Sequence, residues 1–471
     1  MRQEIVGEVK TDFPTADTAV LNLFLPCPAG VQDYLAEEVA RITGGAAQNL
    51  RTSRGGVALQ GDWATVQRLN LHSRLAQRVL IELAHAPYHQ EVDLYETALT
   101  VAWEQWFSVY QTFKIDLTAQ ASPLQSLNFA ALKIKDAVAD RFRARAGSRP
   151  SVDTQWPDVR IFAHLTNDRM ALYIDTSGEP LFKRGWREDK GDAPLKETLA
   201  AAMIAASGWD PASGQPLYDP CCGSGTIAVE AAQMACRMAP GVQRRFGFER
   251  LLPFQAHVWQ QLRAEAREGE LRDAPVLVYG SDVAHRMVDF AQRNAQRAGV
   301  AHAVQLRGGD ALQRMPPTET PGILLINPPY GERIAAAGVA GQRAEERARS
   351  AAPRVHRVGG TLGTGTLREA AASRGGRESA IMAAGSEDDD FFARLASHWK
   401  KNYTGWTAWM LTPDRDLPRR MRLKETRKIP MWNGPIECRL FRFDLVAGSM
   451  QTRPQRQAGE AAGAGDGGPR T

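Results

Sequence analysis

The chain has 471 residues, which is more than one hydrophobic core usually accommodates, so we expect two or three domains. Its composition is that of a globular protein, and no apolar run reaches the roughly 18 residues that a membrane-spanning helix needs. A net charge of +5 is compatible with a nucleic-acid partner without establishing one. The five cysteines form no CxxC pair and the N-terminus is no signal peptide, so we expect a cytoplasmic protein without metal.

The N-terminal part of the chain, residues 19–176, reads as a mixed α/β region. Short apolar segments alternate there with segments whose apolar residues recur at helical spacing. The strands are predicted at 19–26, 55–62, 113–120 and 170–176, and the helices at 31–42, 63–84 and 127–145.

From about residue 190 the pattern changes to strands that alternate with helices, which is typical of a parallel sheet. An antiparallel pair that turns at Asn433–Gly434 closes the region. The parallel strands are predicted at 216–222, 275–282, 303–310, 322–329 and 405–413, the helices at 226–238 and 284–299, and the closing pair at 427–434 and 437–446.

Two segments carry almost no large apolar side chains. Residues 335–386 consist mainly of Ala, Gly, Arg and Ser, and residues 451–471 have a similar composition. Neither can bury enough surface to offset the entropy lost on ordering. We expect a disordered insert and a disordered tail.

Three acidic residues mark one crevice of the predicted sheet. Asp219 opens the glycine-rich turn DPCCGSGT between a strand and a helix, and Asp282 and Asp310 end the next two strands. In an open parallel sheet, ligands bind beyond the carboxyl ends of the strands. A dinucleotide-binding fold places its ribose-binding acid about 20 residues after the glycines. Asp282 comes much later, which disfavours NAD.

The sequence Asn327-Pro328-Pro329-Tyr330 ends a fourth apolar strand above the same crevice. The side-chain carbonyl of Asn327 and the backbone carbonyl of Pro328 are two acceptors that suit an NH2 group. Tyr330 offers a flat face on which a planar base can stack. Two acceptors on an aromatic amine favour the pyramidal geometry that develops when its nitrogen attacks a methyl donor.

These motifs, in this order, resemble class I S-adenosylmethionine-dependent N-methyltransferases. The segments TSRGGVALQGD, NLHSRLAQRVLIEL and NFAALKIKDAVADRF resemble a ferredoxin-like and THUMP arrangement, and the C-terminal segment LKETRKIPMWNGPIECRLFRFDL also matches. Together the chain resembles the bacterial 23S ribosomal RNA guanine-N2-methyltransferase family. The resemblance implies a Rossmann-like domain with a mostly parallel seven-stranded sheet, preceded by an α+β RNA-binding region. It places the ferredoxin-like region at 19–85, an overlapping THUMP domain at 45–167 and the methyltransferase domain at 190–450.

The resemblance also assigns roles to residues. Asp219, Gly223 and Gly225 would bound the methionine moiety of S-adenosylmethionine, with the segment Pro194–Ile204 lining the same end, whereas Asp282 would bind the ribose and Asp310 the adenine. The target guanine would lie against the NPPY residues. The cofactor set is Lys196, Thr198, Asp219, Gly223, Gly225, Thr226, Asp282, Asp310 and Asn327, and the catalytic set is Asn327, Pro328, Pro329 and Tyr330.

Basic residues of the N-terminal half suit contacts to RNA phosphates, which position an RNA without reading its sequence. The expected partner is 23S rRNA or a precursor of the large subunit, bound by a monomer with one activity, since the chain ends before a second methyltransferase domain. A tRNA guanine-N2 methyltransferase, a DNA adenine-N6 methyltransferase and a non-catalytic assembly factor stay open as alternatives. The RNA-binding candidates are Arg51, Arg54, Arg74, Arg78, Lys133, Lys135 and Arg141, with Arg143 and Arg145 beside them.

Overall fold

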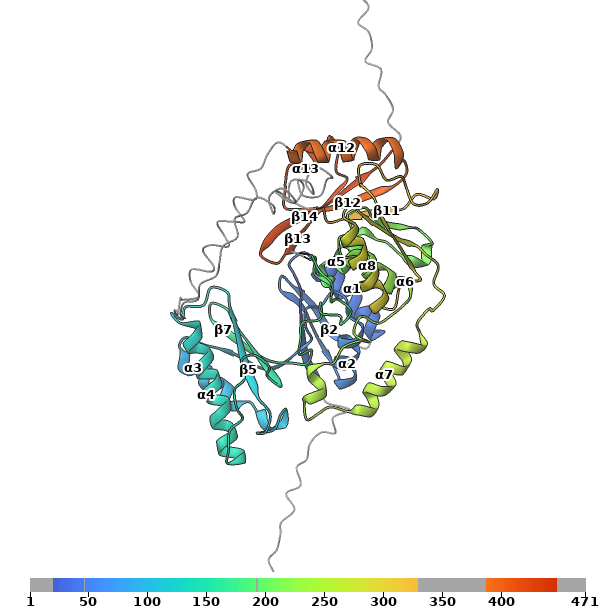
Figure 1. Cartoon of the computed structure of the whole chain (residues 1–471). Coiled ribbons are helices and arrows are strands. Elements are labelled where there is room, and N and C mark those ends of the chain that lie inside the picture. The colour runs from blue at the N-terminus through green and yellow to red at the C-terminus, as the bar shows by residue number, and fades with distance from the viewer. Residues whose placement is uncertain (1–19, 46, 192–193, 329–386, 447–471) are drawn as a thin grey trace, which may run out of the picture.

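A computed structural model describes residues 20–45, 47–191, 194–328 and 387–446. It contains two seven-stranded sheets, one in each half of the chain (Figure 1). No helix in these described ranges is long and apolar enough to cross a membrane.

The N-terminal sheet has the strand order β2-β3-β1-β4-β7-β6-β5. Its neighbouring strands are antiparallel, except that β5 and β6 run parallel. Helices α3 and α4 pack on each other at the β5 end of this sheet, away from the second sheet (Figure 1). The elements are β1 (Leu21–Pro26), α1 (Gln32–Thr43), β2 (Gln48–Ser53), β3 (Gly56–Gly61), α2 (Trp63–His72), β4 (Leu80–Pro87), α3 (Glu91–Thr100), the 3-10 helix Trp103–Gln105, β5 (Phe113–Ala119), α4 (Leu127–Ala146), β6 (Val159–Leu165) and β7 (Arg169–Asp175).

The helix predicted over residues 63–84 is wrong beyond His72. The buried carboxylate of Glu38 on α1 accepts hydrogen bonds from the Ser73 hydroxyl (2.7 Å), the Arg74 N–H (2.9 Å) and the Leu75 N–H (3.2 Å). These backbone donors are therefore unavailable to a continuing helix. The chain then forms β4, which pairs with β1 on one side and β7 on the other.

The second sheet has the order β10-β9-β8-β11-β12-β14-β13. The strands from β10 to β12 are parallel, and β14 runs antiparallel to both β12 and β13. The elements are α5 (Glu197–Ser207), the 3-10 helix Pro211–Ser213, β8 (Leu217–Asp219), α6 (Thr226–Ala235), the 3-10 helix Gly247–Arg250, α7 (Ala256–Glu268), β9 (Val278–Asp282), α8 (His285–Arg297), β10 (Val304–Gly308), β11 (Ile323–Ile326), α12 (Glu387–Asn402), β12 (Thr407–Thr412), α13 (Leu417–Met421), β13 (Arg427–Asn433) and β14 (Ile436–Asp444).

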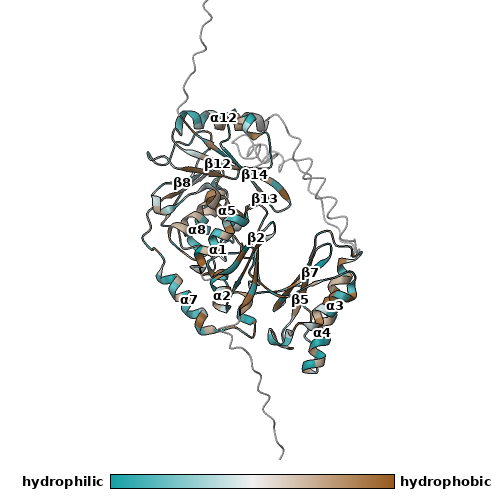
Figure 2. Ribbon diagram, turned by 180° about the vertical axis from the view of Figure 1, so that it is seen from behind, coloured by the Kyte–Doolittle hydropathy of each residue, from teal (hydrophilic) through white to brown (hydrophobic). Residues whose placement is uncertain are grey.

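This topology confirms the predicted Rossmann-like, mostly parallel seven-stranded sheet and its closing antiparallel pair. The turn lies at Gly434–Pro435, one residue later than the predicted Asn433–Gly434, because Asn433 still pairs with Ile436. Gly434 adopts a φ of 63°, which favours glycine. Seen from behind, α5 is largely apolar in colour, whereas α7 carries a long hydrophilic face (Figure 2). The predicted disordered insert at 335–386 and tail at 451–471 lie outside the described residues.

The two halves share one apolar core and one buried ion cluster. A continuous set of buried side chains runs from Leu23 in the N-terminal sheet to Leu440 in β14. Within it, Glu230 on α6 binds Arg74 (3.1 Å) from the loop after α2 and Arg184 (3.0 Å) from the segment after β7. The N-terminal half is thereby fixed to the helix that follows the glycine-rich turn.

Candidate cofactor crevice

Four polar residues follow four adjacent parallel strands. Across the order β10-β9-β8-β11 they are Asp310, Asp282, Asp219 and Asn327. The chain order reverses between β8 and β11, and such a switch point opens a crevice at the carboxyl edge of a parallel sheet. The structure therefore brings the three predicted acids and Asn327 to one edge.

The glycine-rich turn is held against this edge by Asp282. The Asp282 carboxylate accepts the Gly223 N–H and the Ala284 N–H, each at 2.9 Å. Gly225 has a φ of 86°, and a Cβ at that position would lie 2.8 Å from the Ala291 side chain. The close packing of α6 against α8 thus requires glycine at 225.

The crevice is rich in carboxyl groups that have no ion-pair partner in the described part of the chain. Burial raises the pKa of Asp219 to about 8, with the Cys221 N–H opposing and the Asp282 charge adding to the shift. Burial also raises the pKa of Asp282. Among the described residues no Lys, Arg or His forms an ion pair with Asp219, Asp282 or Asp310. Such a site is suited to a cationic ligand, because a positive group would repay the cost of burying the carboxylates.

Arg187 belongs to this neighbourhood and was missed by the sequence analysis. Its guanidinium binds the Glu197 carboxylate (2.8 Å), the Thr226 hydroxyl (2.8 Å) and the Leu195 carbonyl (3.1 Å). Its Nη1 atom is buried and has no hydrogen-bond partner within the described part of the chain. No motif marks Arg187 in the sequence; only the fold brings it to the first residue of α6.

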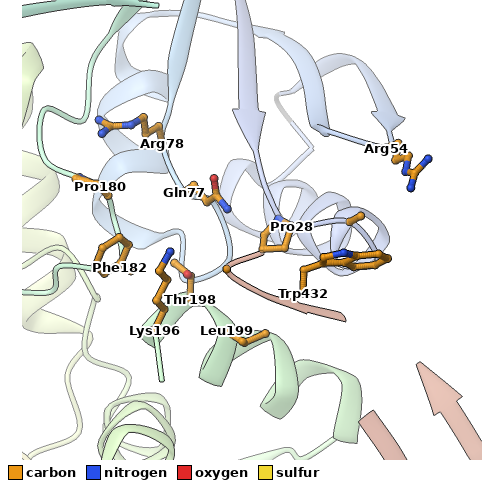
Figure 3. A pocket seen from close by; sticks show the side chains of 12 residues that line it. Pro28, Arg54, Gln77, Arg78, Pro180, Phe182, Lys196, Thr198, Leu199 and Trp432 are labelled. Atoms are coloured by element: carbon orange, nitrogen blue, oxygen red, sulfur yellow. The ribbon is translucent and has the colours of Figure 1, made fainter. Parts of the chain in front are cut away.

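Lys196 and Thr198, both predicted to bind the cofactor, line a cavity of about 510 Å³. This cavity lies between the start of α5, the N-terminal half and the β13–β14 hairpin (Figure 3). Glu197, which stands between them in the sequence, turns instead to Arg187. The cofactor role of Lys196 and Thr198 stays a prediction.

The NPPY motif is described only in part. Asn327 is half-buried and Pro328 is buried directly after β11. Pro329 and Tyr330 lie outside the described residues, so their predicted roles stay predictions.

The predicted RNA-binding residues differ in whether their side chains already have partners in the described part of the chain. Arg74 is wrong as a phosphate ligand, because its side chain is buried on Glu230 and on the Met238 carbonyl. Arg78 is bound to Asp175, Lys135 to Asp136 and Arg141 to Glu104. Lys133 lies 5.2 Å from the Phe129 ring centroid. Arg51 and Arg54 are exposed and, in the described part of the chain, have no side-chain hydrogen bond or ion pair.

Comparison with known families identifies three domains in chain order. The model of an RlmL ferredoxin-like domain matches residues 22–80, that of the THUMP domain residues 88–175, and that of the RMKL-like methyltransferase domain residues 184–372. The chain carries a THUMP domain and an RMKL-like methyltransferase domain. Strands β8, β9, β10 and β11 of the second sheet, with the glycine-rich turn and the three acids, lie within the range matched by the methyltransferase model.

Relatives and solved structures that resemble this chain agree with these domains. This chain is 32% identical to the "Ribosomal RNA large subunit methyltransferase K/L" of Aeromonas salmonicida (strain A449), and the match covers 92% of this chain and 56% of the relative. The protein of the same name in Shewanella loihica is 35% identical, over 91% of this chain and 54% of the relative. The chain thus spans about half the length of these relatives. The solved structure of SMU.472 with SAH, 24% identical, has the same fold, with a TM-score of 0.71 over 90% of this chain and 98% of that one.

Proposed function

We propose that this protein transfers a methyl group from S-adenosylmethionine to the N2 amino group of a guanine in 23S ribosomal RNA. The observation that carries the proposal is the row Asp310, Asp282, Asp219 and Asn327 along one sheet edge, in a chain that also has a THUMP domain. The names of the relatives support rRNA as the substrate. The substrate class supports a cytoplasmic location, and we propose that the protein acts as a monomer.

The crevice fits the proposed cofactor on two independent grounds. Asp219 is a buried carboxyl group that no described cation pairs with, which suits the α-ammonium group of a methionine moiety. The guanidinium of Arg187 contacts Thr226, and its buried Nη1 atom has no hydrogen-bond partner among the residues that the structure describes, which suits the α-carboxylate of the same moiety. Asp282 and Asp310, on the next two strands, would hold the ribose and the adenine. When bound, S-adenosylmethionine supplies an electrophilic methyl group.

The protein's own part in the reaction is orientation of the amine. The Asn327 side-chain carbonyl and the Pro328 backbone carbonyl would accept the two hydrogens of the guanine amino group, and Tyr330 would stack on the base. Acceptors on both hydrogens favour the pyramidal amine over the planar one, which is stabilisation of the transition state. Pairing and stacking inside a duplex keep the guanine amino group from the methyl donor. The guanine is therefore expected to be flipped out or single-stranded.

The test is a methyl-transfer assay with three substrates. Tritiated S-adenosylmethionine is incubated with the protein and with 23S rRNA, bulk tRNA or duplex DNA, and labelled nucleosides are identified by mass spectrometry. N2-methylguanosine in 23S rRNA is expected. A label found in tRNA alone, or as N6-methyladenine in DNA, would overturn the rRNA assignment.

Asn327→Ala tests whether Asn327 serves the methyl transfer or the binding of the cofactor. We expect methyl transfer to fall by at least 100-fold, the scale of one lost transition-state hydrogen bond, while S-adenosylhomocysteine still binds. Loss of both together would show that Asn327 serves cofactor binding rather than the amine.

A further inference from the structure

The cavity beside α5 is built by four separate parts of the chain. Pro28 and Arg54 come from the ferredoxin-like domain, Phe182 from the segment after β7, Lys196 from the start of α5, and Trp432 from the β13–β14 hairpin. Its volume of about 510 Å³ falls within the range of small-ligand sites. The cavity is therefore a junction between the RNA-binding half and the methyltransferase domain.

Its lining combines cations and aromatic rings. Arg54, Arg78 and Lys196 line it, and none of its lining residues in the described ranges is an Asp or a Glu. Lys196 is exposed and lies 5.2 Å from the Phe182 ring centroid, and Arg54 is exposed and unpaired in the described chain. Figure 3 shows Lys196 and Phe182 on one side of the cavity and Trp432 on the other, with Arg54 beyond it. Aromatic faces beside cations are the chemistry that binds single-stranded nucleic acid.

The wall that carries Trp432 is held in place. Gly30, with a φ of 87°, approaches the hairpin so closely that a Cβ there would lie 2.1 Å from the Pro430 carbonyl oxygen. Arg427 in β13 also bonds the Tyr34 hydroxyl of α1 at 3.4 Å. The Trp432 ring is thus presented by a strand that packs tightly against the ferredoxin-like domain.

The cavity adjoins the crevice but has the opposite charge. Glu197, which stands between the lining residues Lys196 and Thr198, points away to Arg187, and Arg187 reaches Thr226 at the end of the glycine-rich turn. The crevice itself is lined by the carboxyl groups of Asp219, Asp282 and Asp310, which offer a phosphate no favourable charge. An RNA strand that delivers a base to Asn327 must therefore place its phosphates on a neighbouring basic wall.

Resting on the proposed function, we propose that this cavity binds one nucleotide of the single-stranded RNA that flanks the target guanine. Trp432 stacks on its base, and Arg54 and Lys196 contact the phosphates on either side. The cavity is then the point at which the RNA passes from the N-terminal half to the catalytic crevice.

The test measures RNA affinity of the full chain by fluorescence anisotropy, with a fluorescein-labelled single-stranded RNA dodecamer as the probe. Trp432→Ala should raise Kd about tenfold, the scale of one lost base stack, and Trp432→Phe should retain most of the affinity. Arg54→Ala should weaken binding and reduce the slope of log K against log salt by about one. Arg267→Ala, which removes an exposed arginine on α7, is the matched control and should bind like the wild type.

Ultraviolet cross-linking of the same RNA, followed by peptide mass spectrometry, should place an adduct on the hairpin peptide that contains Trp432. S-adenosylhomocysteine affinity reports that each variant is folded, and Arg54→Ala, at an exposed position, decides the matter should Trp432→Ala be unstable. If Trp432→Ala and Arg54→Ala both kept the wild-type affinity and salt slope, the nucleotide site in the cavity would be overturned and the proposed function would stand. A wild-type protein that binds no RNA and methylates none would overturn the proposed function as well.

Discussion

Asp219 carries the clearest electrostatic signature in the methyltransferase domain. Its pKa is raised from 3.8 to about 8, chiefly by burial. A carboxylate that meets the α-ammonium group of a cofactor must be ionised, so binding releases a proton below pH 8. The affinity for S-adenosylhomocysteine should then fall about tenfold for each unit between pH 8 and pH 6.

Isothermal titration calorimetry across this pH range, in buffers of different ionisation enthalpy, measures both the affinity and the proton release. Asp219→Asn should bind more weakly and should lose this pH dependence. A wild-type affinity that is flat between pH 6 and pH 8 would contradict the assignment of Asp219.

The same pKa predicts how the ligand-free protein responds to pH. Between pH 3.8 and about 8, folded Asp219 holds a proton that the unfolded chain has lost, so its contribution to stability falls as pH rises through that window. Asp219→Asn has no ionisable group at this position, so its stability does not fall with pH for this reason. Its Tm should exceed that of the wild type by a margin that grows from pH 5 to pH 8 and then levels off. Scanning calorimetry at four pH values checks the trend, and a margin that shrinks with pH would contradict it.

The sequence predicts individual site residues only where a local rule applies. Asp219, Asp282, Asp310 and Asn327 each end an apolar strand, and parallel strands bring such ends to one edge. Arg187 and Glu197 follow no such rule, because they meet Thr226 through tertiary packing. Arg74 was misassigned for the same reason: a buried arginine and an exposed one look alike in a helical pattern.

At the scale of the elements, two of the strands that were not predicted, β2 and β4, are formed by pairing rather than by a local pattern. Strand β2, with the sequence QNLRTS, has no apolar alternation and is a strand only because it pairs with β3. Strand β4 follows α2 without a Gly or Pro, so its apolar residues extend the helical pattern. What ends α2 is Glu38, which is 35 residues away from Ser73.

Glu38→Ala should therefore lower the free energy of unfolding by about 3 kcal/mol or more. It leaves two backbone N–H groups and one hydroxyl buried without an acceptor, and each such group costs about 1–3 kcal/mol. Urea denaturation measures the change. Glu37→Ala on the exposed face of the same helix is the matched control and should lie within about 0.5 kcal/mol of the wild type. Equal effects of the two substitutions would contradict this role of Glu38.

At the scale of the whole molecule, the decisive contact is the ion cluster that joins the halves. Glu230, which is fully buried, is bound by Arg74 and Arg184, and Arg184 also donates to the carbonyls of Leu181 and Arg74. Burial lowers the pKa of Arg74, and the Glu230 carboxylate opposes that shift. The sequence contains no sign of this arrangement, because its three members lie in the ferredoxin-like domain, the connecting segment and α6.

Glu230→Gln should lower the free energy of unfolding by about 3–5 kcal/mol, because it leaves two buried guanidinium groups without their anion. Glu268→Gln, on the exposed end of α7, should be near neutral. Because the cluster belongs to both halves, hydrogen exchange should accelerate together at Arg74–Leu75 and along α6. Faster exchange in only one of these segments would mean that the halves are held by their apolar contacts alone. Joint acceleration would show that the glycine-rich turn and the N-terminal half depend on one buried charge, which on the proposed function would connect RNA docking with the geometry of the crevice.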